Sequence, residues 1–70
     1  MERSKVNSSK IRSVGYDERA RVLEVELTDG SIFQYSGVSQ EVHRRMMSAP
    51  TIASFYQDRI EEDFSRKRIR

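Results

Sequence analysis

The sequence predicts an α+β fold in which a three-stranded antiparallel β-meander packs against two C-terminal α-helices. On either side of the turn at residues 28–30, apolar residues alternate with polar ones, which is typical of a half-buried β-hairpin. From Val38 onward the apolar residues recur every three or four positions, as in amphipathic helices. A chain of 70 residues without cysteine has room for one such domain with a small core.

The loop length of the hairpin decides its register. A three-residue loop over Thr28-Asp29-Gly30 gathers the apolar side chains of both strands on one face, whereas a two-residue loop would put acidic side chains beside the aromatic rings. The x-Asp-Gly triplet also suits a type I turn followed by a left-handed residue, because Gly30 has no Cβ to oppose positive φ. We therefore expect the longer loop, which pairs Leu23 with Tyr35 and Val25 with Phe33 and makes both rings core residues.

The first strand of the meander is predicted at residues 11–16. Its alternation is broken, since Ile11 and Val14 fall on opposite faces, and a β-bulge at Gly15 would reconcile them. Tyr16 is expected to be a structural residue of this strand. Residues 1–7 are polar and charged apart from one valine, so they are expected to form a loose N-terminal arm before a domain at 8–64.

Two helices should cover the apolar face of the sheet. The first begins after Ser39, whose hydroxyl can accept from a free N–H of the first turn, and ends before Pro50. The second is expected to be capped by Thr51 and to run to about residue 63 or 64, with Ile60 on its apolar stripe. Phe55 and Tyr56 fit the core between this helix and the sheet.

The positive charge is concentrated at the two ends of the chain. The net charge is +2, but without the tail at 65–70 the remaining nine basic residues face eleven acidic ones. Basic terminal segments can contact nucleic acid or acidic surfaces, although such short ends are more often simply solvated. The cations that could bind phosphate are Lys5, Lys10, Arg12, Arg66, Lys67, Arg68 and Arg70.

No catalytic or metal-binding constellation is visible in the sequence. His43 is the only histidine and is expected to be exposed on the first helix, with neither cysteine nor a second histidine to complete a metal site. Glu24 and Glu26 lie two residues apart, but no base, nucleophile or phosphate-binding loop accompanies them, so they are interpreted as a solvated face. The chain is therefore not expected to be an enzyme, and no cofactor is implied.

The sequence contains no apolar run of membrane-spanning length and no apolar stretch of a secretory signal near its start. The absence of cysteine is compatible with a reducing compartment. A soluble, cytoplasmic protein without a membrane partner is the corresponding expectation.

Over residues 8–60 the chain resembles the KTSC domain, a family named after the C-terminus of certain lysyl-tRNA synthetases and also found as small free-standing bacterial proteins. The similar positions are Ser8-Ser9-Lys10-Ile11, Val14-Gly15-Tyr16-Asp17, Gly30, Phe33-Gln34-Tyr35, Val38, Ala49-x-Thr51, Phe55-Tyr56 and Ile60. The sequence departs from the family pattern at Phe33, where tyrosine is usual, at Ser39, where proline is usual, and at Thr51-x-Ala53, where the family has Ser-x-Gly. The resemblance implies an uncharacterised function, with RNA binding suggested by the synthetase context.

Two functional hypotheses follow. The first is a non-catalytic module that binds RNA through phosphate contacts of its basic ends. The second is a small protein-interaction module that uses a sheet edge or a helix surface. They differ in salt dependence, because phosphate binding weakens steeply as salt rises and an apolar interface changes little.

Overall fold

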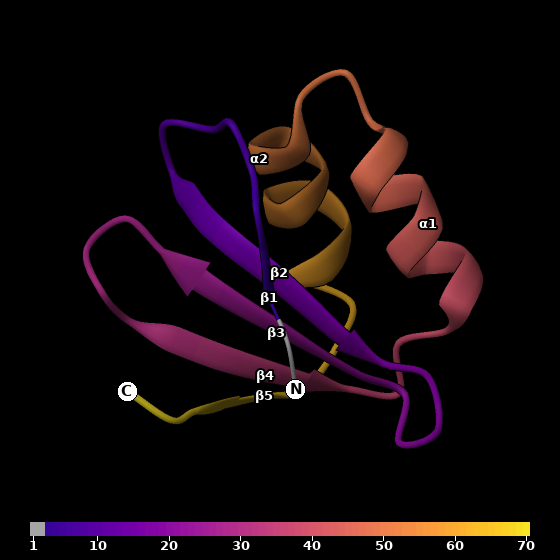
Figure 1. Cartoon of the computed structure of the whole chain (residues 1–70). Helices are drawn as coiled ribbons and strands as arrows, with labels where there is room; N and C mark the ends of the chain where they lie inside the picture. The colour runs from indigo at the N-terminus through magenta and orange to yellow at the C-terminus, as the bar shows by residue number, and fades with distance from the viewer. Residues whose placement is uncertain (1–2) are drawn as a thin grey trace.

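The structure is a computed structural model that describes residues 3–70 and has an α+β architecture (Figure 1). Four strands come first, two helical segments follow, and a fifth strand ends the chain. The elements are β1 (Arg3–Lys5), β2 (Ile11–Asp17), β3 (Val22–Leu27), β4 (Ile32–Ser36), α1 (Gln40–Ser48), α2 (Ile52–Phe55), the π-helix η1 (Tyr56–Ile60) and β5 (Arg66–Arg68).

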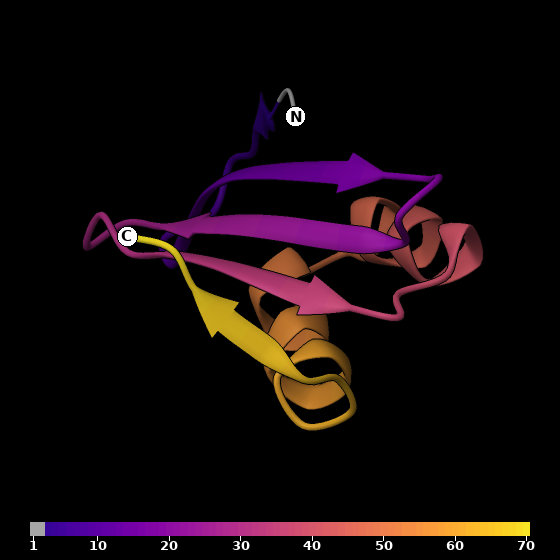
Figure 2. The same cartoon turned by 90° about the horizontal axis from the view of Figure 1, so that it is seen from below.

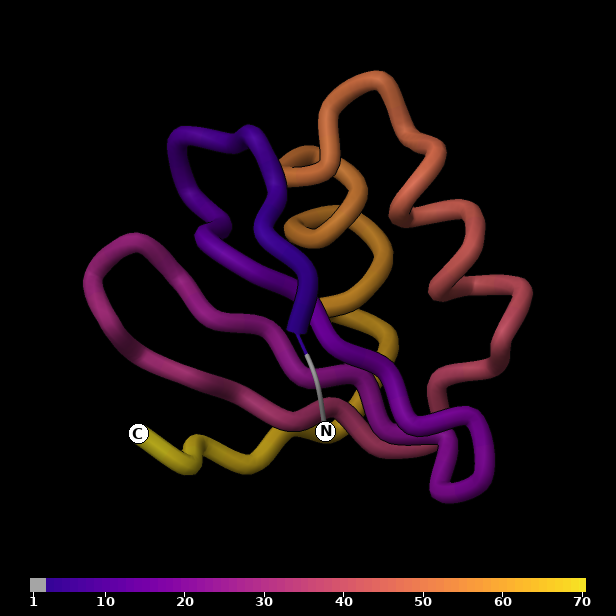
Figure 3. The backbone as a smooth tube through the Cα atoms, in the orientation of Figure 1, coloured from indigo at the N-terminus to yellow at the C-terminus, as the bar shows by residue number. Residues whose placement is uncertain are grey.

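The sheet has five antiparallel strands in the order β1-β2-β3-β4-β5, so the predicted meander forms its centre and the expectation of three strands was wrong (Figure 2). Residues 3–5 of the expected loose arm pair with β2, while Met1 and Glu2 lie outside the described residues. The expected C-terminal tail returns along β4 as β5, as the yellow segment of Figure 3 shows. Both added strands are short, charged edge strands, a common way to end a sheet.

The hairpin of β3 and β4 confirms the three-residue loop and its register. Leu23 lies opposite Tyr35, and Val25 lies opposite Phe33. The Gly30 N–H donates to the Leu27 carbonyl at 3.0 Å, and Gly30 has a φ of +95°, as a type I turn followed by a left-handed residue requires.

Gly30→Val should lower the free energy of unfolding by at least about 1 kcal/mol, because a β-branched residue is strained at positive φ. A Cβ at this position would meet no atom within 4 Å, so the loss would come from the backbone and not from a clash. Urea denaturation measures it, and Gly30→Asn, which tolerates positive φ better, should cost less. An unchanged midpoint for the valine variant would contradict the assigned turn.

The irregularity in β2 lies at Arg12 and not at Gly15. The pairing with β3 shifts between Ile11 and Ser13, so Arg12 is the extra residue of a bulge. This bulge turns Ile11 and Val14 to the same face, where they are 0% and 3% exposed. The reason for expecting a bulge was therefore correct, and its position was wrong.

The helices cover one face of the sheet, as Figures 1 and 2 show. Ser39 caps α1 as predicted, accepting from the Val42 N–H at 3.2 Å, and α1 ends two residues before Pro50. The second helix differs from the prediction, since Thr51 makes no side-chain cap bond and the helix continues as the π-helix η1 only to Ile60. The shift to π geometry closes a bond from the Glu61 N–H to the Tyr56 carbonyl at 2.9 Å.

The core lies between this face and the helices. Tyr35 from β4 and Tyr56 from η1 are both fully buried. Their hydroxyl oxygens are 2.6 Å apart, so each hydroxyl is the hydrogen-bond partner of the other. Their rings meet edge to face at a centroid distance of 5.7 Å. The remaining fully buried side chains are Ile11, Leu23, Val25, Val38, Met46 and Ile60. The predicted core roles of Tyr35 and Ile60 are thus confirmed, and Phe33 packs against this cluster while partly buried.

Candidate functional site

The C-terminal cations form a fixed row along one edge of the sheet. We call Arg66, Lys67, Arg68 and Arg70 the basic edge. Register places Arg66 opposite Tyr35 and Arg68 opposite Phe33, on the helix side of the sheet. Lys67 lies opposite Gln34 and therefore belongs to the other face, which we call the outer face. The basic edge thus carries cations on both faces of the sheet, and all four of its residues are exposed.

The backbone of β5 adds unpaired donors to this edge. Hydrogen bonds join the Ser36 N–H to the Ser65 carbonyl and the Ile69 N–H to the Ile32 carbonyl. The alternation of an antiparallel ladder then turns the N–H groups of Arg66 and Arg68 away from β4. Backbone N–H groups at such an edge can donate to phosphate oxygens in the same way as side chains do.

Two guanidinium groups of the basic edge lie over the Phe33 ring. The Arg66 Cζ lies 4.5 Å from the ring centroid and the Arg68 Cζ lies 6.0 Å from it. The Tyr35 side chain raises the pKa of the Arg66 guanidinium above its ordinary value. Among residues 3–70, Arg66, Lys67 and Arg68 make no ion pair with a carboxylate.

The remaining predicted cations are not equivalent to these. Lys10 already has an acidic partner, because its Nζ lies 3.7 Å from a carboxylate oxygen of Glu61. Arg12 and Arg70 both approach the Glu26 carboxylate, at 3.8 and 4.0 Å. Lys5 belongs to β1, at the far edge of the sheet from β5. Within residues 3–70, the two basic termini therefore do not form one patch, although Arg12 and Arg70 share the Glu26 carboxylate.

Glu24 is buried on the outer face, contrary to the expected solvated position. It is 6% exposed, because β1 brings Arg3 over it, and it accepts hydrogen bonds from Arg3 and from Gln34. Burial alone raises the pKa of this carboxyl, but the bonds from Gln34 and Arg3 outweigh it and hold the pKa below its usual range. Glu24 therefore ties β1 to β3 and β4 as a charged group. The alternation of apolar and polar residues in β3 could not predict the burial of Glu24. Arg3, which covers Glu24, belongs to residues 1–7, which were expected to form a loose arm.

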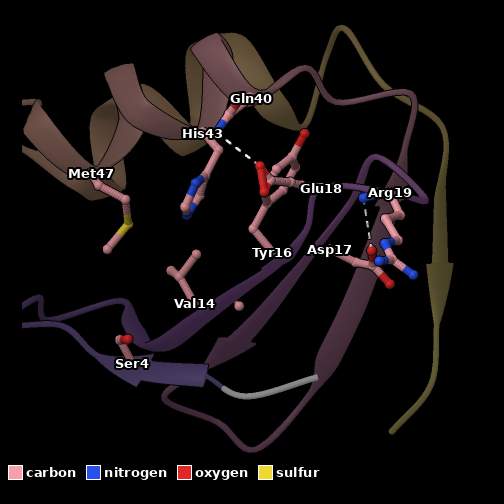
Figure 4. Close-up of a pocket in the computed structure, with 10 residues that line it drawn as sticks. Ser4, Val14, Tyr16, Asp17, Glu18, Arg19, Gln40, His43 and Met47 are labelled. Atoms are coloured by element: carbon pink, nitrogen blue, oxygen red, sulfur yellow. Dashed lines mark hydrogen bonds between the residues drawn. The ribbon is translucent and has the colours of Figure 1, made fainter.

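A cleft of about 700 Å³ opens between α1 and the end of β2 (Figure 4). Its aromatic wall is Tyr16 stacked on His43, with ring centroids 4.6 Å apart and planes 9° apart. The Tyr16 hydroxyl donates to the Val38 carbonyl at 2.6 Å, which fixes the ring between the sheet and the start of α1. At the mouth, the Gln40 amide donates to the Glu18 carboxylate at 3.1 Å. His43 is therefore half-buried in a stack and not an exposed helical residue as expected.

Burial lowers the pKa of the His43 imidazole below its ordinary value of 6.5. The unfolded chain then binds a proton more readily than the folded one, so the folded state is most favoured above about pH 6.5 and loses stability as the pH falls through the folded pKa. Thermal melting at neutral pH and at about pH 5 should show a larger decrease in Tm for the wild type than for His43→Gln. Equal decreases would contradict a neutral, stacked His43.

Within residues 3–70, no helix is long and apolar enough to cross a bilayer. No three histidine or acidic side chains in the same range lie close enough together to hold a metal ion.

Comparison with known proteins places this architecture. Residues 7–64 match the family model described as the KTSC domain. The crystal structure of a KTSC domain protein from Yersinia pestis is similar over 99% of this chain and 97% of its own, with a TM-score of 0.92 and 36% sequence identity. An uncharacterised protein of Stutzerimonas stutzeri (strain A1501) is 34% identical over 56 residues, which are 80% of this chain and 79% of that protein.

Proposed function

This chain belongs to the KTSC domain family, and we propose that it is a non-catalytic module that binds RNA through the phosphate backbone, using the basic edge. The observation that carries the proposal is the folding of the C-terminal cations into an exposed strand. Cations fixed on a strand lose less conformational freedom on binding than cations on a flexible tail.

Three features of the basic edge support this role. Within residues 3–70, Arg66, Lys67 and Arg68 make no ion pair with an acidic side chain, so no such side chain neutralises their charge. The Arg68 Nε does donate to the Arg70 main-chain oxygen at 3.1 Å. The outward N–H groups of β5 add uncharged phosphate donors. Arg12 lies beside the basic edge, because Arg12 and Arg70 approach the same Glu26 carboxylate. The synthetase context of the family makes RNA the first ligand to test.

The test is a titration of labelled RNA at several salt concentrations. Four phosphate contacts predict a slope of log affinity against log salt of up to about −0.7 per contact, roughly −3 in all. The variant Arg66→Gln, Lys67→Gln, Arg68→Gln and Arg70→Gln should lose most of this slope and most of the affinity at low salt. It keeps the length of the chain and the backbone pairing of β5, so its loss of affinity reports on the four cationic side chains and not on the strand.

A matched control removes the same charge elsewhere. Arg19, Arg44, Arg45 and Arg59 are exposed and lie outside the basic edge, and their joint replacement by glutamine changes the net charge equally. This control should keep most of the affinity. Equal losses in both variants would mean that net charge, and not the basic edge, governs binding, and no binding by the wild type at low salt would refute the proposal.

The cleft beside α1 favours a second candidate, a protein-interaction module. It combines an aromatic wall with the apolar side chains of Val14 and Met47 and a polar mouth, the usual make-up of a recognition site. Binding there would depend little on salt and would survive neutralisation of the basic edge. Those two outcomes separate it from the RNA proposal.

A further inference from the structure

We propose that Arg66, held over Phe33, is a stacking surface for one unpaired nucleobase, so that the basic edge selects single-stranded nucleic acid over a duplex. This inference rests on the proposed function and assigns the form of nucleic acid that the basic edge takes. It gives Arg66 a different task from that of the other three cations.

The geometry of Arg66 differs from that of a phosphate-binding side chain extended into solvent. Its Cζ lies 4.5 Å from the Phe33 centroid, within the range of a cation–π contact. Phe33 is itself held in place, since it packs against the core cluster while keeping part of its ring accessible. Arg66 therefore has a fixed support on one side, and the residue as a whole is exposed to solvent.

An arginine supported in this way is suited to a base. Nucleobases stack on aromatic rings and on guanidinium groups, and the stack tolerates any base because each has a π-face. In a duplex these faces are covered by the neighbouring base pairs, so only phosphates would remain within reach. A single strand can place one base on Arg66 while its adjacent phosphates meet Arg68, Lys67 and the outward N–H groups of β5.

The arrangement of the other cations agrees with this division. Arg68 lies on the same face as Arg66 but farther from the ring, at 6.0 Å. Lys67 lies on the outer face, and Arg70 approaches Glu26 there. A nucleic-acid single strand that lies along β5 would thus contact cations on both faces of the sheet edge. At one end of β5 it would also contact the guanidinium of Arg66, which Phe33 supports.

The test uses charge-conserving variants. Arg66→Lys keeps the positive charge but has no planar group, and it should lower the affinity for labelled single-stranded RNA by about tenfold while leaving duplex affinity and the salt slope nearly unchanged. Arg70→Lys is the matched control, because Arg70 has no ring beneath it, and it should leave both affinities nearly unchanged. Phe33→Leu, compared at equal folded fraction by circular dichroism, should reproduce the effect of Arg66→Lys.

An abasic strand of the same length provides an independent readout. The wild type should bind it about as weakly as Arg66→Lys binds the normal strand, since both lack the stack. If the wild type binds RNA with the expected salt slope but Arg66→Lys behaves like Arg70→Lys, the stacking inference is wrong and phosphate binding stands. If the wild type binds neither strand at low salt, the proposed function fails and the inference fails with it.

Discussion

Ile60→Ala is expected to lower the free energy of unfolding by about 2–5 kcal/mol, enough to leave a domain of this size partly unfolded at room temperature. Ile60 is 0% exposed and ends the π-helix η1, where it packs in the same cluster as Tyr56 and the central strands. The alanine would leave a cavity in the core. The five-residue η1 can move to fill it only in part, because Tyr56 and Ile60 at its two ends are both buried. Urea denaturation followed by circular dichroism measures the loss.

Ile69→Ala is the matched control for this prediction. The residue type is the same and the atoms removed are the same, but Ile69 is 45% exposed. Its replacement should change the free energy of unfolding by no more than about 0.5 kcal/mol. A loss for Ile60→Ala as small as that of the control would show that η1 does not close the core.

The central fold was predictable because its signals are local. The turn at residues 28–30 fixed the register of β3 against β4, and Gly30 has the positive φ that the turn requires. Ser39 and Pro50 bounded α1 for similarly local reasons, a side-chain cap at the start and a missing N–H at the end. Each of these features depends on the chemistry of a few consecutive residues, which a single sequence displays.

The edge strands could not be predicted in the same way. Arg66-Lys67-Arg68 and Arg3-Ser4-Lys5 have no apolar alternation, and their pairing depends on the free backbone edges of β4 and β2. A backbone edge accepts almost any short sequence, and charged residues are common there because they discourage pairing with further chains. The sequence therefore showed two charged ends, and only the fold shows that they complete the sheet.

The candidate site was predicted in part for the same reason. The cations of the basic edge were identified, but their grouping was not, because it depends on which acids the fold brings near. The bulge at Arg12 turns that side chain toward Glu26, and Lys10 meets Glu61 from the other end of the chain. The support of Arg66 by Phe33 follows from the pairing of β4 with β5, which no pattern within either strand reveals.

Deleting residues 66–70 should lower the free energy of unfolding by about 2–4 kcal/mol, because these residues pair with β4 as the edge strand β5. The deletion removes the bonds that join Ile32 to Ile69 and Arg70, together with the pairing of Gln34 and Lys67. Each backbone bond contributes about 1 kcal/mol net, and Phe33 also loses the cover of two arginines.

The glutamine variant of the basic edge separates the strand from its charge. It keeps every backbone bond of β5 and loses only the arginine cover of Phe33, so its free energy of unfolding should fall by less than that of the truncated chain while its affinity for RNA falls. The truncated chain should lose both stability and affinity. A truncated chain as stable as the wild type would mean that residues 66–70 do not pair with β4 in solution. Arg66 would then have no fixed place over Phe33, and the cations would act as the flexible tail that their sequence alone suggests.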